Sequence, residues 1–471
     1  MRPLLIADRR PAGQGVIRVI EPGTGVPFDE VAAAGPGDLD AAVAAAHAAF
    51  PAWAQRTAVA RAEILFRFAD LVRAHAEELA VLEARNVGKP IGDARWEANH
   101  VADTLRYYAA AADKFFGDTI PLNKPGLNIT VHDPLGVVGL IVPWNFPMVI
   151  ATWKLAPALA CGNTVVLKPA SLTPLTALRL GELGLEAGLP PGVLNVVPGP
   201  GAAIGAALAA HPDVAKIGFT GETATGRAIM AAAAATIKRV GLELGGKSPN
   251  IIFADVDIDQ AAAEAVGSVF ANAGQDCCAR SRIIVERQIA EPFVAAMAAK
   301  AGAMVVGNPL DATTQMGPLV SAAQRERTEA YIAVGRGEGA RLVCGGERLD
   351  GAGYFMRPAV FAEARPRMRI VDEEIFGPVA VVLTFDSEDE AVALANDTIY
   401  GLSGSLWTND LKRGLRVARA VRTGVLSVNS SSSVHLQAPF GGYKQSGLGR
   451  ELGMHAMAHY TEVKNIYFET T

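Results

Sequence analysis

Apolar residues recur at helical spacing, with charged residues between them, along the first part of the chain. A period of three to four residues is typical of an amphipathic helix that buries one face. We therefore expect helices at residues 41–50, 61–75 and 99–116, within a helical region over 38–116. Residues 119–133 are polar and extended, with prolines nearby, which indicates a linker or a hairpin that leaves the main body.

From residue 136 the pattern changes to short apolar runs that alternate with amphipathic segments, which is typical of a parallel sheet covered by helices. A first series has predicted strands at 136–142, 164–167, 194–197 and 216–219 and helices at 175–187, 202–210 and 223–235. A second series has predicted strands at 250–253, 283–286, 379–385 and 425–429 and helices at 258–271, 289–301 and 388–395. The tail at 461–468 alternates like an edge strand. The pattern predicts an α/β protein with a doubly wound sheet and a second α/β domain.

Composition narrows the class of protein. The 471 residues exceed one ordinary core and predict roughly two or three domains. A net charge of −5 lacks the basic excess of a nucleic-acid-binding protein. The apolar runs are too short to span a membrane, and the N-terminus lacks the apolar core of a signal peptide. The four cysteines have no C-x-x-C spacing, so we expect a cytoplasmic protein without a disulfide framework or a metal site.

Two adjacent thiols and one glutamate are candidates for catalysis. Cys277 and Cys278 follow a predicted helix, but the neighbouring Asp276 opposes formation of a thiolate. Glu243 ends an apolar run, and an acid in apolar surroundings has a raised pKa that suits a general base. Each group alone also fits a structural role, as a buried thiol or as a capping or salt-bridged carboxylate.

Three further segments suggest an oxyanion site and a dinucleotide site. Asn145 lies between two prolines that fix its backbone, so its amide can stabilise an oxyanion, although an ordinary proline-rich turn is equally possible. Gly221 and Gly226 lie between a strand and a helix, where a pyrophosphate can meet the helix N-terminus. Their spacing is not the G-x-G-x-x-G fingerprint. Lys168 ends another strand, at the edge where ligands bind in open sheets; a solvated loop lysine is the alternative.

Taken together and in this order, these motifs resemble the aldehyde dehydrogenase superfamily along nearly the whole chain. The matching stretches are residues 143–147, 168–169, 219–226, 242–249, 274–277, 373–378 and 439–447. Cys277 lies 34 positions after Glu243, which is the separation of nucleophile and base in that family. The resemblance therefore selects Cys277, and not Cys278, as the nucleophile.

The resemblance implies oxidation of an aldehyde to a carboxylic acid with NAD or NADP. Cys277 would attack the aldehyde, Asn145 and the Cys277 backbone N–H would hold the oxyanion, and Glu243 would activate the water that hydrolyses the thioester. Lys154 and Glu451 would relay protons to Glu243. The implied cofactor residues are Trp144, Lys168, Ser171, Thr220, Gly221, Glu222, Gly226, Leu244, Gln324, Glu374 and Phe376. The implied substrate tunnel comprises Phe146, Ile150, Trp153, Asp276, Val434 and Phe440.

The same resemblance implies three parts of the fold. A Rossmann-type cofactor domain would take residues 1–114 and 135–245, and the catalytic domain residues 246–460. A small β oligomerisation arm would take residues 115–134 and 461–471, and family members are dimers or tetramers. The expected partners are a small aldehyde and further copies of the chain, with neither nucleic acid nor membrane.

At two positions of the cofactor site, this sequence has a different residue type from the one that is common in the family. Ser171 stands where many NAD-preferring members carry a glutamate that repels a 2′-phosphate, so we expect NADP to be accepted alongside NAD. Glu222 stands where a small hydroxyl residue is common, and its carboxylate weakens pyrophosphate binding unless it turns to solvent.

The residues of the implied tunnel indicate which class of aldehyde the protein accepts. Trp153 replaces the arginine of succinate-semialdehyde enzymes and, with the other aromatic residues, favours an apolar aliphatic or aromatic aldehyde. Asp276, with Glu97 and His100 near the mouth, leaves an aminoaldehyde as the alternative. The serine run 430–433 is not typical of the family, and we interpret it as a loop near the tunnel.

The sequence argues against three rival functions. A catalytically silent, crystallin-like structural member would not need the intact set of Cys277, Glu243 and Asn145. A CoA-acylating dehydrogenase generally lacks the base that Glu243 provides. A stand-alone thioesterase would not need Lys168 or Glu374.

Overall fold

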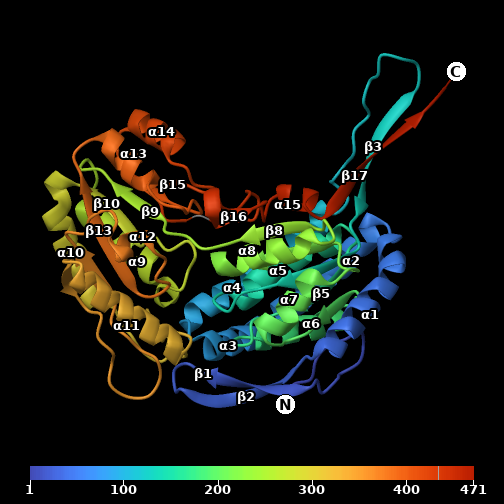
Figure 1. The fold of residues 1–471 in the computed structure, drawn as a ribbon, viewed down its shortest axis with the longest axis horizontal. Coiled ribbons are helices and arrows are strands. Elements are labelled where there is room, and N and C mark those ends of the chain that lie inside the picture. Colours follow the sequence, from blue (N-terminus) through green and yellow to red (C-terminus); the bar gives the residue numbers. More distant parts are fainter. Residues whose placement is uncertain (433, 471) are drawn as a thin grey trace.

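Two mainly parallel β-sheets, each lying between layers of helices, make up the body of the protein (Figure 1). The computed structural model describes residues 1–432 and 434–470. The arrangement confirms the α/β class that the alternating strands and helices predict. None of the helices in these described residues is both long enough and apolar enough to cross a membrane.

The first sheet has its topological switch point at its central strand. Across the sheet, the strands are β16 (Gly447–Leu448), β8 (Arg239–Glu243), β7 (Lys216–Thr220), β4 (Val137–Ile141), β5 (Thr164–Lys168) and β6 (Leu194–Val196). All neighbours are parallel except β16 and β8. Because β5 and β7 lie on opposite sides of β4, the carboxyl ends of β4 and β7 flank the crevice where open α/β sheets bind ligands.

Alternating side chains of β4 explain why helices cover both faces of this sheet. Val138 and Leu140 enter one core, whereas Val137 and Ile141 enter another. The helices of the first face are α2 (Ala58–Ala74), α3 (Ala76–Val87), α4 (Ile91–Ala111), α5 (Pro147–Ala160) and α6 (Leu175–Glu186). Those of the second face are α1 (Pro36–Ala54), α7 (Ala206–Ala210) and α8 (Thr223–Ala234).

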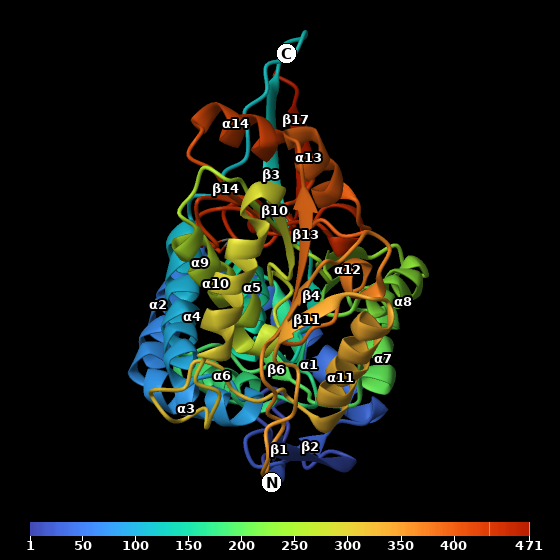
Figure 2. The same cartoon turned by 90° about the vertical axis from the view of Figure 1, so that its left-hand side faces the viewer.

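The second sheet lies beside the first and is also covered on both faces (Figures 1 and 2). Across it, the strands are β11 (Arg341–Cys344), β12 (Ala359–Ala362), β13 (Val379–Phe385), β10 (Arg282–Glu286), β9 (Pro249–Ile252), β14 (Ser405–Trp407) and β15 (Ser427–Val428). One core contains α9 (Ile258–Phe270), α10 (Ala290–Gly302), α11 (Ala322–Gly337) and α12 (Arg369–Asp372). The other contains α13 (Glu388–Asn396) and α14 (Leu411–Ala420). The second α/β series is thus confirmed.

A two-stranded antiparallel ribbon projects from the body (Figure 1). Strand β17 (Thr461–Phe468) pairs with β3 (Leu127–Pro134) along its whole length, which confirms the edge strand expected in the tail. Thr119 bridges to Ile129, so the segment before β3 folds back as a hairpin and is not a linker. Thr471 lies outside the described residues.

Several elements differ from those that the pattern of apolar residues predicts. The helix predicted at 99–116 is α4, which begins earlier, directly after Pro90, and ends at Ala111. The pattern did not predict the hairpin of β1 (Gly15–Glu21) and β2 (Val26–Ala33), nor helix α5. After the second sheet, the chain returns to the first, where β16 pairs with β8 and α15 (His455–Ala458) contacts α5.

Candidate active site

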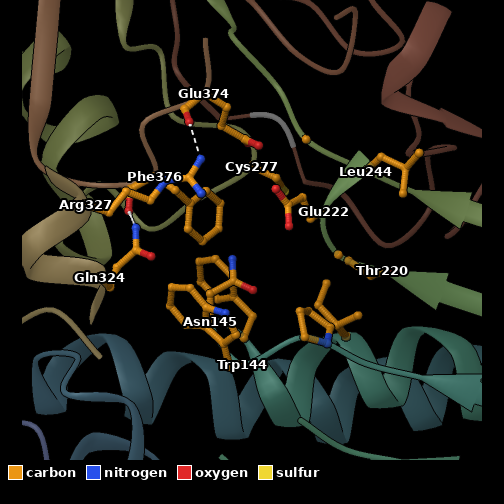
Figure 3. A pocket seen from close by; sticks show the side chains of 15 residues that line it. Trp144, Asn145, Thr220, Glu222, Leu244, Cys277, Gln324, Arg327, Glu374 and Phe376 are labelled. Carbon is orange, nitrogen blue, oxygen red and sulfur yellow. Dashed lines mark hydrogen bonds between the residues drawn. The ribbon is translucent and has the colours of Figure 1, made fainter. Parts of the chain in front are cut away.

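A cavity that is open to solvent is lined by residues from both halves of the body (Figure 3). The segments that follow β4, β7 and β8 supply Trp144, Asn145, Phe146, Gly221, Glu222, Leu244 and Gly245. The loops before β10 and β13, together with α11, supply Cys277, Gln324, Arg327, Glu374 and Phe376. The cavity therefore lies at the crevice that the topology of the first sheet predicts.

Cys277 lies half-buried in the cavity wall, at the end of a strained loop. Asn272 and Ala273 have φ values of +49° and +55°, which are uncommon for residues with a side chain. Gly246 passes close to this loop, because a Cβ at Gly246 would lie 2.3 Å from the carbonyl oxygen of Cys277. The fold thus fixes the backbone on both sides of the nucleophile candidate.

The surroundings of Cys277 favour a neutral thiol. A hydrogen bond with Cys278, burial, and the nearby Asp276 and Glu374 raise the pKa of Cys277 well above its usual value. The Asp276 carboxylate accepts the backbone N–H of Cys278 at 2.8 Å. The side-chain ligand atoms of Asp276, Cys277 and Cys278 lie within 4.8 Å of one another. Cys278 itself is buried in the hydrophobic core.

Asn145 lines the same cavity as Cys277 (Figure 3), and its amide is held in one orientation. The Asn145 Nδ2 donates to the carbonyl oxygen of Gln275 at 2.9 Å, and this uses one of its two N–H groups. The backbone oxygen of Asn145 accepts from Lys89 Nζ and from Asn272 Nδ2, each at 3.0 Å. The second amide N–H is therefore left to meet a negative oxygen in the cavity.

Glu243 is a buried carboxylate at the end of β8. Burial, followed by the charge of Glu451, raises the pKa of Glu243 well above its usual value. Its Oε2 finds no hydrogen-bond partner among the described residues. Lys154 donates to Glu451 at 2.5 Å, so the three groups expected to act together are close in space. The Glu243 Oε1 lies against Gly441, and the cavity wall formed by the described residues does not include Glu243.

Glu374 faces the turn that follows β8. Its Oε1 accepts the backbone N–H of Gly246 at 2.9 Å, and burial raises its pKa to about 7. Arg327 donates to the backbone oxygen of Glu374 at 3.1 Å (Figure 3). A Cβ at Gly245 would lie 2.2 Å from the Glu374 carboxylate, so only glycine lets the carboxylate occupy this position.

Two aromatic rings meet across the cavity. The rings of Trp144 and Phe376 are perpendicular, with their centroids 5.2 Å apart. Phe376 has φ +60°, and its backbone oxygen accepts from Gln324 Nε2 at 2.6 Å. Gln324 therefore stabilises an unfavourable backbone conformation that directs Phe376 to the cavity (Figure 3).

The N-terminal end of α8 presents polar groups to the same cavity. The hydroxyls of Thr220 and Thr223 are buried, and neither has a hydrogen-bond partner among the described residues. Glu222 is exposed and lines the cavity at the helix N-terminus. A Cβ at Gly226 would lie 2.6 Å from a methyl carbon of Leu244, so this glycine allows α8 to approach the end of β8.

Lys168 is the last residue of β5, and Ser171 lies in the segment that follows this strand. Lys168 is buried, and desolvation lowers its pKa to about 8. The Ser171 hydroxyl donates to the carbonyl oxygen of Gly199 at 3.0 Å. Neither residue is part of the cavity wall formed by the described residues.

The apolar residues of the expected tunnel belong to, or pack against, the hydrophobic core that Cys277 also packs against. Phe146 and Ile150 line the cavity, and Val434 packs on the same hydrophobic core. The rings of Trp153 and Phe440 meet at 5.2 Å. Whether these residues together form a channel stays a prediction.

Glu97 and His100, expected near the mouth of the tunnel, are not exposed, and that expectation is wrong for these two residues. Glu97 is buried and accepts from Lys89 at 2.6 Å. His100 is buried too, and its Nε2 accepts from Trp153 Nε1 at 3.1 Å. Both side chains already have hydrogen-bond partners inside the protein.

In the serine run, Ser431 donates to Glu264 at 2.9 Å, and Ser433 lies outside the described residues.

Comparison with known proteins identifies the family. The model of the aldehyde dehydrogenase family matches residues 10–466. The chain belongs to the aldehyde dehydrogenase family. It is similar to retinal dehydrogenase 2 of Mus musculus, at 46% identity over 96% of this chain and 88% of that protein. It is also similar to betaine aldehyde dehydrogenase of Bacillus subtilis (strain 168), at 44% identity over 92% of this chain and 90% of that protein.

The fold of this aldehyde dehydrogenase family member is likewise that of solved members. An NAD+ complex of aldehyde dehydrogenase from Bacillus cereus superposes with a TM-score of 0.98 at 45% identity, covering 100% of this chain and 97% of that structure. The aldehyde dehydrogenase-like fold expected from the sequence is thus confirmed. These relatives act on different aldehydes by name, so they do not single out one substrate.

Sequence reasoning missed several residues that support the site. Ser446 donates to the carbonyl oxygen of Gly245 at 2.6 Å and so fixes the turn after β8. Gln275 is buried, and its side-chain oxygen accepts the backbone N–H of Val320 at 2.9 Å. Lys89 and Asn272 hold the backbone of Asn145. Their contacts join segments that are far apart in the sequence, so no local sequence pattern predicts them.

Proposed function

We propose that this protein oxidises an apolar aldehyde to a carboxylic acid with NAD or NADP, through a thioester on Cys277. The support is that Cys277 and Asn145 share one cavity with Glu374 and Phe376. A nucleophile, an oxyanion donor and the residues that fit a nicotinamide nucleotide would therefore act on the same carbon atom.

The residues present fit a dinucleotide cofactor. The hydroxyls of Thr220 and Thr223 are buried without a partner among the described residues; Thr220 ends β7 and Thr223 begins α8, and phosphate groups bind well at such a helix N-terminus. Glu374 would hold a ribose, and Phe376 and Trp144 would flank the nicotinamide. When bound, the nicotinamide accepts the hydride that the substrate loses.

The first half of the reaction makes a covalent acyl-enzyme. The sulfur of Cys277, whose proton passes to solvent, bonds to the carbonyl carbon, and the electron pair of the C=O bond moves onto oxygen. The free N–H of the Asn145 amide and the Cys277 backbone N–H stabilise that oxygen. Loss of a hydride from the carbon restores the C=O bond and leaves a thioester.

The second half returns the free thiol. Glu243 takes a proton from water, and the water oxygen bonds to the acyl carbon while the carbon–sulfur bond breaks; the sulfur leaves as a thiolate and takes up a proton from solvent. A buried carboxylate with a raised pKa is a strong enough base for this step. Lys154 and Glu451, already joined by a hydrogen bond, would carry the proton away.

The substrate class follows from the side chains around Cys277. Phe146 and Ile150 line the cavity, and Trp153 and Phe440 pack next to them, which favours an aliphatic or aromatic aldehyde. An aminoaldehyde is the alternative, because Asp276 lies beside the nucleophile and a relative is named betaine aldehyde dehydrogenase. The carboxylate of Glu97 does not add to this negative charge, since Lys89 neutralises it.

A panel of aldehydes tested with NAD and with NADP, with and without CoA, examines the proposal directly. Reduced nicotinamide and a free carboxylic acid should appear together, and CoA should not be needed. Among the aldehydes, apolar ones should give the highest kcat/KM, and a higher value for aminoaldehydes would reverse the substrate assignment. No reduced nicotinamide with any aldehyde would indicate a catalytically silent member, and acyl-CoA as the product would indicate the acylating reaction.

Replacement of the two thiols tests the nucleophile. Cys277→Ala should abolish turnover, because no other thiol reaches the cavity wall formed by the described residues. Cys278→Ala serves as the matched control and should retain most of kcat, since Cys278 is buried in the core. Trapping of a labelled acyl group on Cys278 would overturn the assignment.

A further inference from the structure

The backbone oxygen of Asn145 holds this residue in place through hydrogen bonds from two other segments of the chain. That oxygen accepts two hydrogen bonds, from Lys89 Nζ and from Asn272 Nδ2, each at 3.0 Å. A carbonyl oxygen has two lone pairs, so both are occupied. Because the peptide unit is planar, fixing this oxygen fixes the peptide plane that follows Asn145, and the hydrogen bond from the amide to Gln275 orients the side chain on that base.

Lys89 reaches this oxygen from a fully buried ionic cluster. Its exposed fraction is 1%, and those of Glu83 and Glu97 are 0% and 2%. Lys89 Nζ donates to both oxygens of Glu97, at 2.6 and 2.8 Å, and lies 3.7 Å from a carboxylate oxygen of Glu83. It also lies 4.3 Å from the ring centroid of Phe146, the residue after Asn145. Burying these charges costs free energy, so the cluster is not explained by stability alone.

The chain holds Lys89 in a short, rigid turn. Gly88 ends α3 in the left-handed conformation, with φ +93°, and α4 begins at Ile91. A Cβ at Gly88 would lie 2.9 Å from the ring of Pro318, so this turn is packed tightly. Lys89 therefore extends from a fixed base, and its ammonium group has little freedom to leave Asn145.

Asn272 holds the same oxygen from the side of the nucleophile. Its Nδ2 also approaches the backbone oxygen of Gln275 at 3.3 Å, and that oxygen in turn accepts from the Asn145 amide at 2.9 Å. Asn272 has φ +49°, in the strained loop that leads to Cys277. The hydrogen bonds close a ring that joins the loop of Asn145 to the loop of Cys277.

We propose that Lys89 and Asn272 are positioning residues that hold the Asn145 amide at the place where the oxyanion forms next to Cys277. The proposal rests on the proposed function, because it assigns these residues to the oxyanion step. Neither needs to touch the aldehyde. A displacement of the amide by about 1 Å can cost on the order of 10²-fold in rate, so small losses of alignment are measurable.

The test uses Lys89→Met/Glu97→Gln in the full-length protein. Glu97→Gln avoids an unpaired buried Glu97, which would itself destabilise the fold, and Glu83 keeps the hydrogen bond that it accepts from Thr176 at 2.8 Å. We expect kcat to fall about tenfold to a hundredfold, while the Kd of NAD, measured by fluorescence, stays within about twofold. A loss of structure alone would lower the melting temperature and weaken NAD binding as well.

A double-mutant cycle separates positioning from general damage. Asn145→Ala alone should lower kcat by about 10²–10³-fold. In that background, Lys89→Met/Glu97→Gln should cost less than about threefold more, because the amide that it positions is absent. Asn272→Gly allows the left-handed backbone and removes the side chain that carries the donor; it should also lower kcat, by a smaller factor, and cost little more when Asn145 is absent.

A matched control is Lys238→Met, since Lys238 also donates to a backbone carbonyl, that of His211, but lies at the far end of β8. It should leave kcat unchanged. The positioning role is overturned if Lys89→Met/Glu97→Gln keeps the wild-type kcat, or if its loss is the same with and without Asn145. Absence of any aldehyde oxidation by the wild-type protein would instead refute the proposed function.

Discussion

Ser171 and Lys168 set the charge at the end of β5, where the adenosine ribose of the cofactor would lie. Ser171 is neutral and donates to Gly199, so no carboxylate repels a 2′-phosphate near Lys168. We predict that NADP is used alongside NAD, and that Ser171→Glu lowers kcat/KM for NADP by about tenfold, the equivalent of 1.4 kcal/mol of repulsion. The value for NAD should change much less.

Steady-state kinetics with both cofactors provide the measurement for this residue. Because the pKa of Lys168 is about 8, its charge is complete below that pH and is lost above it. Use of NADP should therefore decline between pH 7 and 9 more than use of NAD. A wild-type preference for NAD above about a hundredfold would contradict the interpretation of Ser171.

Glu243 should impose a pH dependence on hydrolysis of the thioester. Its base form is the carboxylate, and its pKa is raised well above the usual value by burial. The deacylation rate should therefore rise with pH above the usual titration range of a glutamate, as the carboxylate forms. Glu243→Gln should lower the rate by about 10²–10⁴-fold and remove this rise.

Single-turnover experiments on the isolated acyl-enzyme measure this step without the hydride transfer. Glu286→Gln is a suitable control, because Glu286 lies at the end of β10, where its carboxylate accepts the backbone N–H of Ala254 at 2.7 Å. The pH profile should keep its shape in this control. An unchanged profile in Glu243→Gln would show that another group titrates.

Individual residues were predictable where the motif carries the chemistry and not where partners are distant in sequence. Cys277, Asn145 and Glu374 lie in matched motifs, and the fold brings them to one cavity. The burial of Glu97 could not be foreseen, because it depends on Lys89 in the preceding turn and on packing of α3 against α4. An acidic residue in a helix usually faces solvent, and this one is neutralised inside.

At the scale of elements, helix α8 directs its N-terminus to the cavity, but the residue in the N-cap position is unusual. Glu222 is the N-cap, makes no side-chain capping bond and adds to the charges that raise the pKa of Glu374. A carboxylate here cancels part of the positive end of the helix dipole that would attract a pyrophosphate. We predict that Glu222→Gln lowers the Kd of NAD by about threefold to fivefold, near 0.7–1 kcal/mol.

Calorimetric titration with NAD measures this change, and the effect should shrink at high salt because the site is exposed. Glu63→Gln, an exposed carboxylate on α2, should leave the Kd unchanged. Weaker NAD binding in Glu222→Gln would mean that the carboxylate makes a favourable contact with the cofactor.

The strands were predictable because buried parallel strands are continuous apolar runs, and β4 and β5 are buried at every position. Helix α5 was missed for a related reason. All fourteen of its residues are buried, so it has no polar face and no helical period. The hairpin of β1 and β2 was missed because its exposed and buried positions alternate too irregularly to indicate strands.

At the scale of the whole molecule, the projecting ribbon of β3 and β17 has little support of its own. A two-stranded ribbon is marginally stable in water unless one face is covered. Yet it carries apolar side chains that are exposed, including Leu127, Val463 and Phe468. Such a surface is typical of a protein interaction site, and we infer that further copies of the chain cover it.

We predict that Val463→Asp disrupts this self-association. Val463 is 63% exposed on β17, so its replacement leaves the fold of the single chain intact, whereas burying an unpaired carboxylate in an interface costs several kcal/mol. Sedimentation velocity at micromolar concentration should show a dimer or tetramer for the wild type and a smaller species for the variant. Val16→Asp, 54% exposed on β1, is the matched control and should keep the wild-type assembly. A wild-type chain that sediments as a monomer, or an unchanged assembly in Val463→Asp, would show that the ribbon is not the interface.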